Sequence, residues 1–107
     1  MNAPKKVAVV GGGISGLAAA YRLSILAKET RLPLILSVLE ARHRFGGVIE
    51  SFNRDGFLME GGPDSFISEK PWALELCREL GLEKDIIQTN PHQITHFMGE
   101  NPLIGLK

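Results

Sequence analysis

The sequence predicts an α/β fold that opens with a strand, a helix and a second strand, on three observations. Residues 7–10 are consecutive apolar residues, typical of a strand buried on both faces. A glycine turn follows at residues 11–13, and an alanine-rich helical run follows the turn. A second apolar run begins after Pro33 and predicts a strand over residues 34–40. Two parallel strands with a helical crossover fit this order.

The spacing of the glycines indicates a nucleotide-binding turn of the Rossmann type. In the pattern G-x-G-x-x-G, the first glycine allows a tight turn and the second admits a phosphate close to the backbone. The third glycine lets the helix pack closely, and the helix N-terminus then presents free N–H groups to the anion. We therefore expect this segment to hold a pyrophosphate. Its residues are Gly11, Gly12, Gly13, Ile14, Ser15 and Gly16.

An acidic residue at the end of the second apolar run strengthens this interpretation. Glu40 follows Gly16 by 40 − 16 = 24 positions, near the roughly 20 positions expected for the acid that binds ribose hydroxyls. An acid at this position favours a free 2′-hydroxyl, and therefore FAD or NAD over NADP. The alternative is a strand–helix–strand unit with a glycine turn and a surface glutamate.

Turn residues and periodicity predict the later elements, which we place in one partial dinucleotide-binding domain over residues 1–107. A complete doubly wound domain has about five or six strands, more than this length accommodates. The expected elements are a helix over residues 14–30, strands over 48–53 and 57–60 joined by an Asp55-Gly56 turn, a loop over 61–65, a helix over 71–80 ended by Gly81, and a strand over 93–98.

Composition excludes several classes of protein. The 12 basic residues balance the 12 acidic residues, which argues against broad electrostatic binding to nucleic acid. The single cysteine, Cys77, excludes an internal disulfide, and the histidines lack the spacing of a metal site. We see no secretory signal and no apolar run long enough for a membrane span. These features predict a cytoplasmic protein and leave peripheral contact with a membrane open.

Several motifs together resemble the N-terminal part of the protoporphyrinogen and coproporphyrinogen oxidases, over about residues 5–90. These enzymes belong to a wider group of FAD enzymes that includes amine oxidases and phytoene desaturases. An oxidoreductase of that wider group is one alternative, and a catalytically inactive nucleotide-binding fragment is another. The motifs are Gly11 to Leu17, Glu40-Ala41, Arg44-Phe45-Gly46-Gly47 and Gly61 to Phe66.

The resemblance implies FAD as the cofactor and oxidation of a porphyrinogen to a porphyrin in heme biosynthesis, with molecular oxygen as the electron acceptor. It places Ala41 beside Glu40 at the adenosine ribose. It places residues 44–48 along the pyrophosphate and ribityl chain, and residues 62–65 close to the flavin ring. No catalytic side chain is implied, because the flavin performs the chemistry. The further residues implied in cofactor binding are Ala41, Arg44, Gly46, Gly47, Val48, Gly62, Pro63, Asp64 and Ser65.

Some roles stay open on the sequence alone. Arg44 is either a phosphate clamp or a residue of a solvated loop, and Asp64 is more simply a turn residue bonded to its own backbone. Members of the porphyrinogen oxidase family that this sequence resembles are several times longer than its 107 residues. We therefore expect the isolated chain to lack a substrate pocket, to be inactive alone, and to self-associate through strand edges that lack partners.

Overall fold

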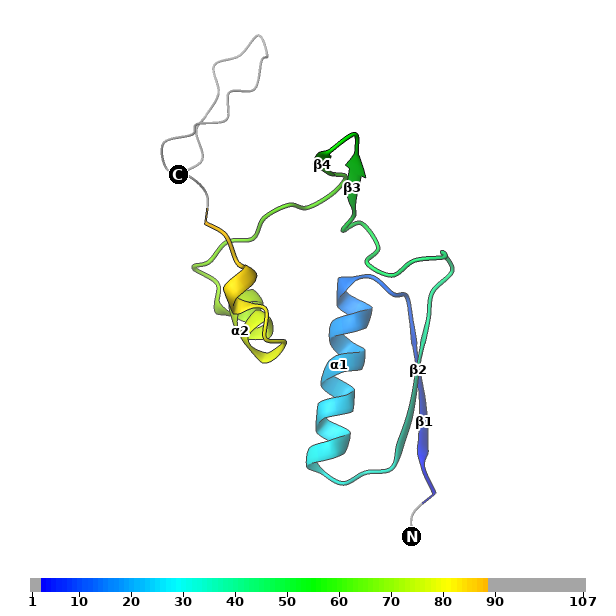
Figure 1. Ribbon diagram of the computed structural model, residues 1–107. Coiled ribbons are helices and arrows are strands. Elements are labelled where there is room, and N and C mark those ends of the chain that lie inside the picture. Colours follow the sequence, from blue (N-terminus) through cyan, green and yellow to red (C-terminus); the bar gives the residue numbers. More distant parts are fainter. Residues whose placement is uncertain (1–2, 89–107) are drawn as a thin grey trace. The chain divides into compact units, whose positions relative to one another are not determined.

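The computed structural model describes residues 3–88, which divide into one unit ending at Phe66 and another beginning at Ile67. The first holds two small sheets and a long helix, and the second holds a short helix and a 3₁₀ turn (Figure 1). In chain order the elements are β1 (Lys5–Val10), α1 (Ile14–Glu29), β2 (Leu34–Leu39), β3 (Ser51–Arg54), β4 (Phe57–Glu60), α2 (Pro71–Glu79) and the 3₁₀ turn η1 (Glu83–Asp85).

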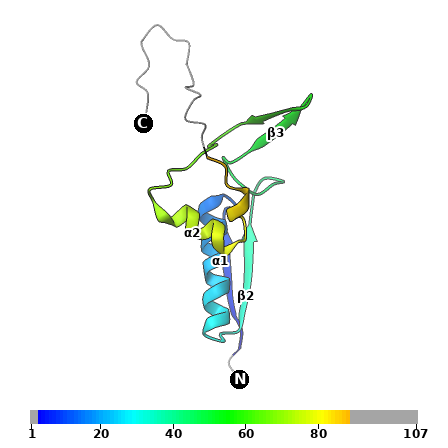
Figure 2. The same ribbon diagram turned by 60° about the vertical axis from the view of Figure 1, so that its left-hand side comes forward.

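The first three elements form the predicted strand–helix–strand unit, so the α/β prediction is confirmed. β1 and β2 pair in parallel, in a register that runs from Lys5 opposite Leu34 to Val10 opposite Leu39. Figures 1 and 2 both show α1 running alongside these strands. β1 begins two residues earlier than the apolar run predicts, because the Lys5 N–H donates to the Pro33 carbonyl at 2.8 Å and extends the ladder.

Burial along β2 alternates, because α1 covers one face of the sheet. Leu34 and Leu36 are half-buried on the covered face, whereas Ile35 and Leu39 are 49% and 54% exposed on the other. Ala20 of α1 is the one buried apolar residue in the described part of the chain. Within residues 3–66 the second face of this parallel sheet therefore has no cover, although parallel sheets are usually covered on both faces.

Helix α1 ends one residue before the predicted position, in a backbone motif that reverses the chain. Arg31 takes a positive φ of 54°, and the Leu32 N–H donates to the Ala27 carbonyl at 2.9 Å. This is the hydrogen-bond pattern of a Schellman cap, in which glycine is the usual residue. Pro33 follows and cannot continue the helix, so the chain enters β2 directly.

Strands β3 and β4 form the predicted hairpin, with Ser51 opposite Glu60 and Arg54 opposite Phe57. Asp55 and Gly56 have φ values of 53° and 82°, as expected for a two-residue hairpin turn with two positive φ angles. The predicted start of the first strand at residue 48 is wrong. The Ile49 N–H donates to the Gly46 carbonyl and the Ile49 carbonyl accepts from Arg44, so this segment closes on the loop before it and the paired strand begins at Ser51.

The second unit contains the predicted helix α2, which begins with Pro71 and is followed by Gly81 at a φ of 73°. The Leu82 N–H donates to the Cys77 carbonyl at 2.8 Å and closes the helix end. None of the helices within residues 3–88 combines the length and apolar character that crossing a membrane requires. The strand predicted over residues 93–98 lies outside the described residues.

Candidate functional site

The glycine turn leaves β1 at its carboxyl end, and two of its glycines are required by the fold itself. Gly11 has a φ of 103°, a backbone conformation that favours glycine, and its N–H donates to the Leu39 carbonyl at 2.7 Å. A Cβ atom on Gly16 would collide with the carbonyl oxygen of Gly11. The first turn of α1 therefore packs directly on the backbone that leaves the strand.

Gly13 differs from these two glycines, because nothing within the described chain requires it. Its φ of −76° and ψ of 180° suit any residue, and an added Cβ would meet only the Gly47 Cα at 3.8 Å. Gly13 is the N-cap of α1, where no side chain of the described residues caps the helix. Space beside the backbone and free N–H groups at a helix N-terminus are what a phosphate group needs.

A second glycine loop, residues 44–50, lies directly against this turn. The Gly46 N–H donates to the Gly12 carbonyl at 2.8 Å, and Gly13 and Gly46 form an isolated parallel bridge. Gly47 has a φ of 61°, and a Cβ there would come within 3.0 Å of the Gly13 Cα. The two glycine segments, residues 11–16 and 44–50, thus make one continuous backbone surface at the N-terminus of α1, which we call the glycine surface.

Arg44 organises the second glycine loop from within. Its guanidinium group donates to the carbonyl oxygens of Phe45, Gly47 and Ile49 at 3.2, 2.7 and 3.2 Å. The same group forms an ion pair with Glu50, 2.9 Å from Nη2 to Oε2. The side chain is half-buried. Neither alternative from the sequence, a free phosphate clamp or a solvated side chain, describes this arrangement.

Glu40 connects the end of β2 to the glycine turn. Its Oε1 accepts from the Arg42 N–H at 2.9 Å, and its Oε2 accepts from the Gly12 N–H at 2.7 Å. The backbone N–H of Arg42, and next that of Gly12, hold the pKa of the Glu40 carboxyl below its usual value of 4.5, because both stabilise the charged form. A carboxylate accepts about four hydrogen bonds, so the group retains acceptor capacity for a ribose hydroxyl.

The lowered pKa gives the Glu40 contact a defined pH dependence. Because the folded-state pKa lies below that of the unfolded chain, the contact stabilises the turn fully above pH 4.5 and is lost as the pH falls through the folded-state value. In an NMR titration from about pH 7 to about pH 3, we expect the amide signals of Gly12 and Arg42 to move together, with a midpoint below 4.5. In the Glu40→Gln control neither amide should show this transition, and a wild-type midpoint above 4.5 would contradict the geometry.

The third glycine segment packs on the second. The Gly61 N–H donates to the Glu50 carbonyl at 2.8 Å, and a Cβ on Gly62 would collide with the Val48 carbonyl oxygen. Residues 63–65 are exposed. The Asp64 carboxylate accepts from the Ser65 hydroxyl at 3.1 Å instead of from its own backbone.

The first unit therefore brings most of the predicted residues into a connected chain of contacts. Among the exposed residues, Val48 and Gly62 still contact each other through the Val48 carbonyl oxygen, whereas Asp64 and Ser65 bond only to each other within the described part of the chain. Two participants were missed: the Phe45 ring covers Gly12, where a Cβ would strike it, and Glu50 pairs with Arg44. Neither residue shows a characteristic spacing in the sequence, although Phe45 lies inside the Arg44-Phe45-Gly46-Gly47 motif. The predicted residues that are exposed are Ile14, Ser15, Ala41, Val48, Gly62, Pro63, Asp64 and Ser65.

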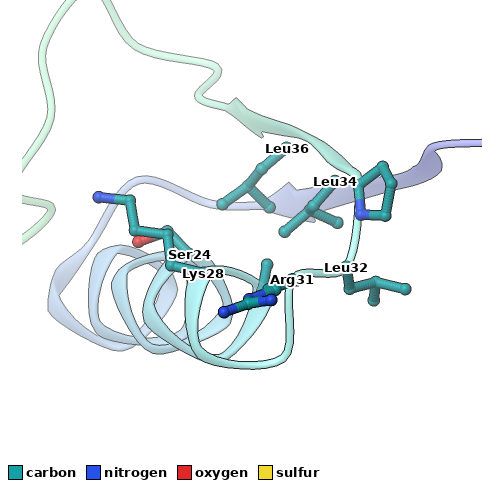
Figure 3. A pocket seen from close by; sticks show the side chains of 8 residues that line it. Ser24, Lys28, Arg31, Leu32, Leu34 and Leu36 are labelled. Carbon is teal, nitrogen blue, oxygen red and sulfur yellow. The ribbon is translucent and has the colours of Figure 1, made fainter.

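A groove of about 340 Å³ lies elsewhere in the first unit, between the C-terminal end of α1 and the start of β2. Ser24 and Lys28 line it from the helix, and Leu34 and Leu36 line it from the strand (Figure 3). Its lining is mostly apolar and contains none of the predicted site residues. The groove is therefore separate from the glycine surface, which begins at the opposite end of α1.

The chain is similar to proteins of known family. Residues 14–101 match the family of flavin-containing amine oxidoreductases. A crystal structure assigned as a protoporphyrinogen oxidase from Exiguobacterium sp. 255-15 is similar, with a TM-score of 0.68 and 38% identity over 77% of this chain and 17% of that one. The family description names a flavin, in agreement with the predicted cofactor.

Similar sequences come from bacteria and plants. The coproporphyrinogen III oxidase of Bacillus subtilis is 48% identical over 74% of this chain and 17% of its own length. That of Staphylococcus aureus is 37% identical over 92% of this chain and 20% of its own length. The chloroplastic protoporphyrinogen oxidase 1 of Spinacia oleracea is 38% identical over 78% of this chain and 14% of its own length. The chain thus spans a fifth or less of these relatives, and it belongs to the family of flavin-containing amine oxidoreductases.

Proposed function

We propose that this chain binds the ADP half of FAD and acts as the cofactor-binding part of an oxygen-dependent porphyrinogen oxidase. The observation that carries the proposal is the glycine surface, in which residues 11–16 and 44–50 meet at the uncapped N-terminus of α1. A pyrophosphate suits this surface because it is an anion that needs close approach to backbone N–H groups. When bound, FAD would supply the hydride-accepting chemistry.

The residues present have distinct tasks in this proposal. Gly13 leaves space for the pyrophosphate, and Glu40 offers its remaining acceptor capacity to the adenosine ribose. Gly47 and Val48 would lie along the pyrophosphate and ribityl chain, and residues 62–65 would lie near the flavin ring. The supporting observations are the open side of Gly13, the two backbone donors on Glu40, and the packing of Gly62 on Val48.

The names of the relatives support a porphyrinogen substrate, either coproporphyrinogen III or protoporphyrinogen IX. The family match also covers amine-oxidising flavoenzymes, which keeps an amine substrate as the second candidate. The uncovered faces of the sheet and hairpin, including Val10 at 82% and Phe57 at 72% exposed, support association with further protein surface.

The test is a titration of the purified 107-residue chain with FAD, followed by flavin fluorescence. We expect saturable binding, with competition by ADP-ribose, because the described contacts serve the ADP half. Aerobic incubation with FAD and coproporphyrinogen III should give porphyrin fluorescence no faster than the spontaneous rate, since no described residue forms a substrate pocket beside the glycine surface. Absence of FAD binding would exclude the proposed cofactor role. FAD-dependent turnover, of a porphyrinogen or of an amine, would contradict the proposal that this chain supplies only the cofactor-binding part of the enzyme.

A further inference from the structure

We propose that Arg44 is a positioning residue, which shapes the second glycine loop for the pyrophosphate without gripping the phosphate itself. The inference rests on the proposed FAD-binding function and deepens it. An arginine that precedes a glycine pair beside an anion site would ordinarily suggest a direct phosphate contact. The contacts of this guanidinium group argue for the other role.

The terminal nitrogens of Arg44 are occupied by the loop. Nη1 donates to the Phe45 and Ile49 carbonyl oxygens, both at 3.2 Å. Nη2 donates to the Gly47 carbonyl oxygen at 2.7 Å and lies 2.9 Å from Oε2 of Glu50. A guanidinium group has five N–H donors, and four of them belong to these two nitrogens. The fork that would hold a phosphate through two hydrogen bonds is therefore already used.

The charge of Arg44 is also compensated. The side chains of Arg44 and Glu50 are 26% and 36% exposed, so the pair is partly shielded from water. A phosphate held by both terminal nitrogens would have to displace the Glu50 carboxylate and loop carbonyl groups from them. The net attraction that this pair offers to an anion is therefore small.

The three carbonyl contacts determine where the neighbouring N–H groups point. In a trans peptide the C=O of one residue and the N–H of the next point in opposite directions, and the described residues contain no cis peptide bond. With the Phe45 carbonyl turned to Arg44, the Gly46 N–H points away and donates to Gly12 at 2.8 Å. By the same geometry, the Gly47 contact directs the Val48 N–H away from the guanidinium group, where an anion can accept it.

The decisive comparison is between Arg44→Lys and Arg54→Lys. Lysine keeps the charge but cannot reach several carbonyl groups in fixed directions. We expect Arg44→Lys to weaken FAD binding roughly 10-fold or more, close to the effect of Arg44→Gln. Arg54, whose side chain is 80% exposed in the hairpin, is the matched control and should bind FAD as the wild type does. At saturating FAD, the ³¹P signals of the bound pyrophosphate should shift in Arg44→Lys only.

A second variant separates positioning from a direct clamp. Glu50→Gln frees the charge of Arg44. If Arg44 contacts the phosphate directly, this variant should bind FAD more tightly than the wild type. If Arg44 positions the loop, the variant should bind FAD equally well or less well. Tighter binding in Glu50→Gln, or near-normal binding in Arg44→Lys, would overturn the inference. Hydrogen exchange at Gly46 in the FAD-free protein gives a readout that does not need the cofactor. It should accelerate in Arg44→Lys while the amides of β1 stay protected, and unchanged Gly46 exchange would refute the positioning role even if FAD binding itself failed.

Discussion

Gly13→Val should abolish FAD binding while leaving the fold of the strand–helix–strand unit intact. The backbone at Gly13 is extended, and the nearest atom to an added Cβ is the Gly47 Cα at 3.8 Å, so the branch point of a valine side chain has no close contact in the chain. The added methyl groups instead occupy the space that the pyrophosphate would need beside the helix N-terminus. We expect affinity for FAD to fall by roughly 100-fold or more, measured by flavin fluorescence titration.

The free energy of unfolding should change by no more than about 1 kcal/mol, the scale of N-cap substitutions. Ala19→Val is the matched control, because it adds the same two methyl groups on the exposed surface of α1. It should bind FAD normally. If Gly13→Val bound FAD as tightly as the wild type, the pyrophosphate could not lie against Gly13. If the variant unfolded, Gly13→Ala would repeat the test with a smaller side chain.

Gly16→Ala, unlike Gly13→Val, should lower the stability of the fold, because it disrupts the turn itself. Replacing glycine by alanine inside a helix normally stabilises it by about 1 kcal/mol. Here the added Cβ would collide with the Gly11 carbonyl oxygen and approach its carbon to 3.0 Å, so the backbone must move. Overpacking against a rigid neighbour costs about 1–3 kcal/mol or more, which outweighs the helix preference.

The measurement is chemical unfolding followed by circular dichroism, together with amide hydrogen exchange in β1 and α1. We expect Gly16→Ala to be less stable than the wild type and to lose FAD affinity as a consequence. Arg22→Ala, on the exposed face of the same helix, should unfold like the wild type. A stabilised Gly16→Ala variant would show that α1 does not pack on the Gly11 carbonyl.

Features that depend on short-range chemistry could be predicted from the sequence. The apolar runs and the glycine spacing located β1, the turn and α1, because these patterns reflect burial and backbone freedom within a few residues. The Asp55-Gly56 pair predicted the hairpin for the same reason, since its positive φ angles are set locally. Boundaries were less accurate. β3 begins at Ser51 because the backbone of Ile49 bonds to the loop before it, which no local pattern reveals.

The relations between distant residues were decided only by the tertiary structure. The sequence by itself marked Gly12, Glu40 and Arg44 as candidates, but not that Glu40 accepts the Gly12 N–H or that Arg44 pairs with Glu50. The motif predicted that Gly13 admits a phosphate and that Gly16 allows the helix to pack closely, but not which atoms lie beside each of them. Gly16 is needed because a carbonyl group lies against it, and Gly13 leaves open space at the same turn. That difference arises from how the strand, the helix and the second glycine loop pack together, and packing distances are not encoded in residue spacing.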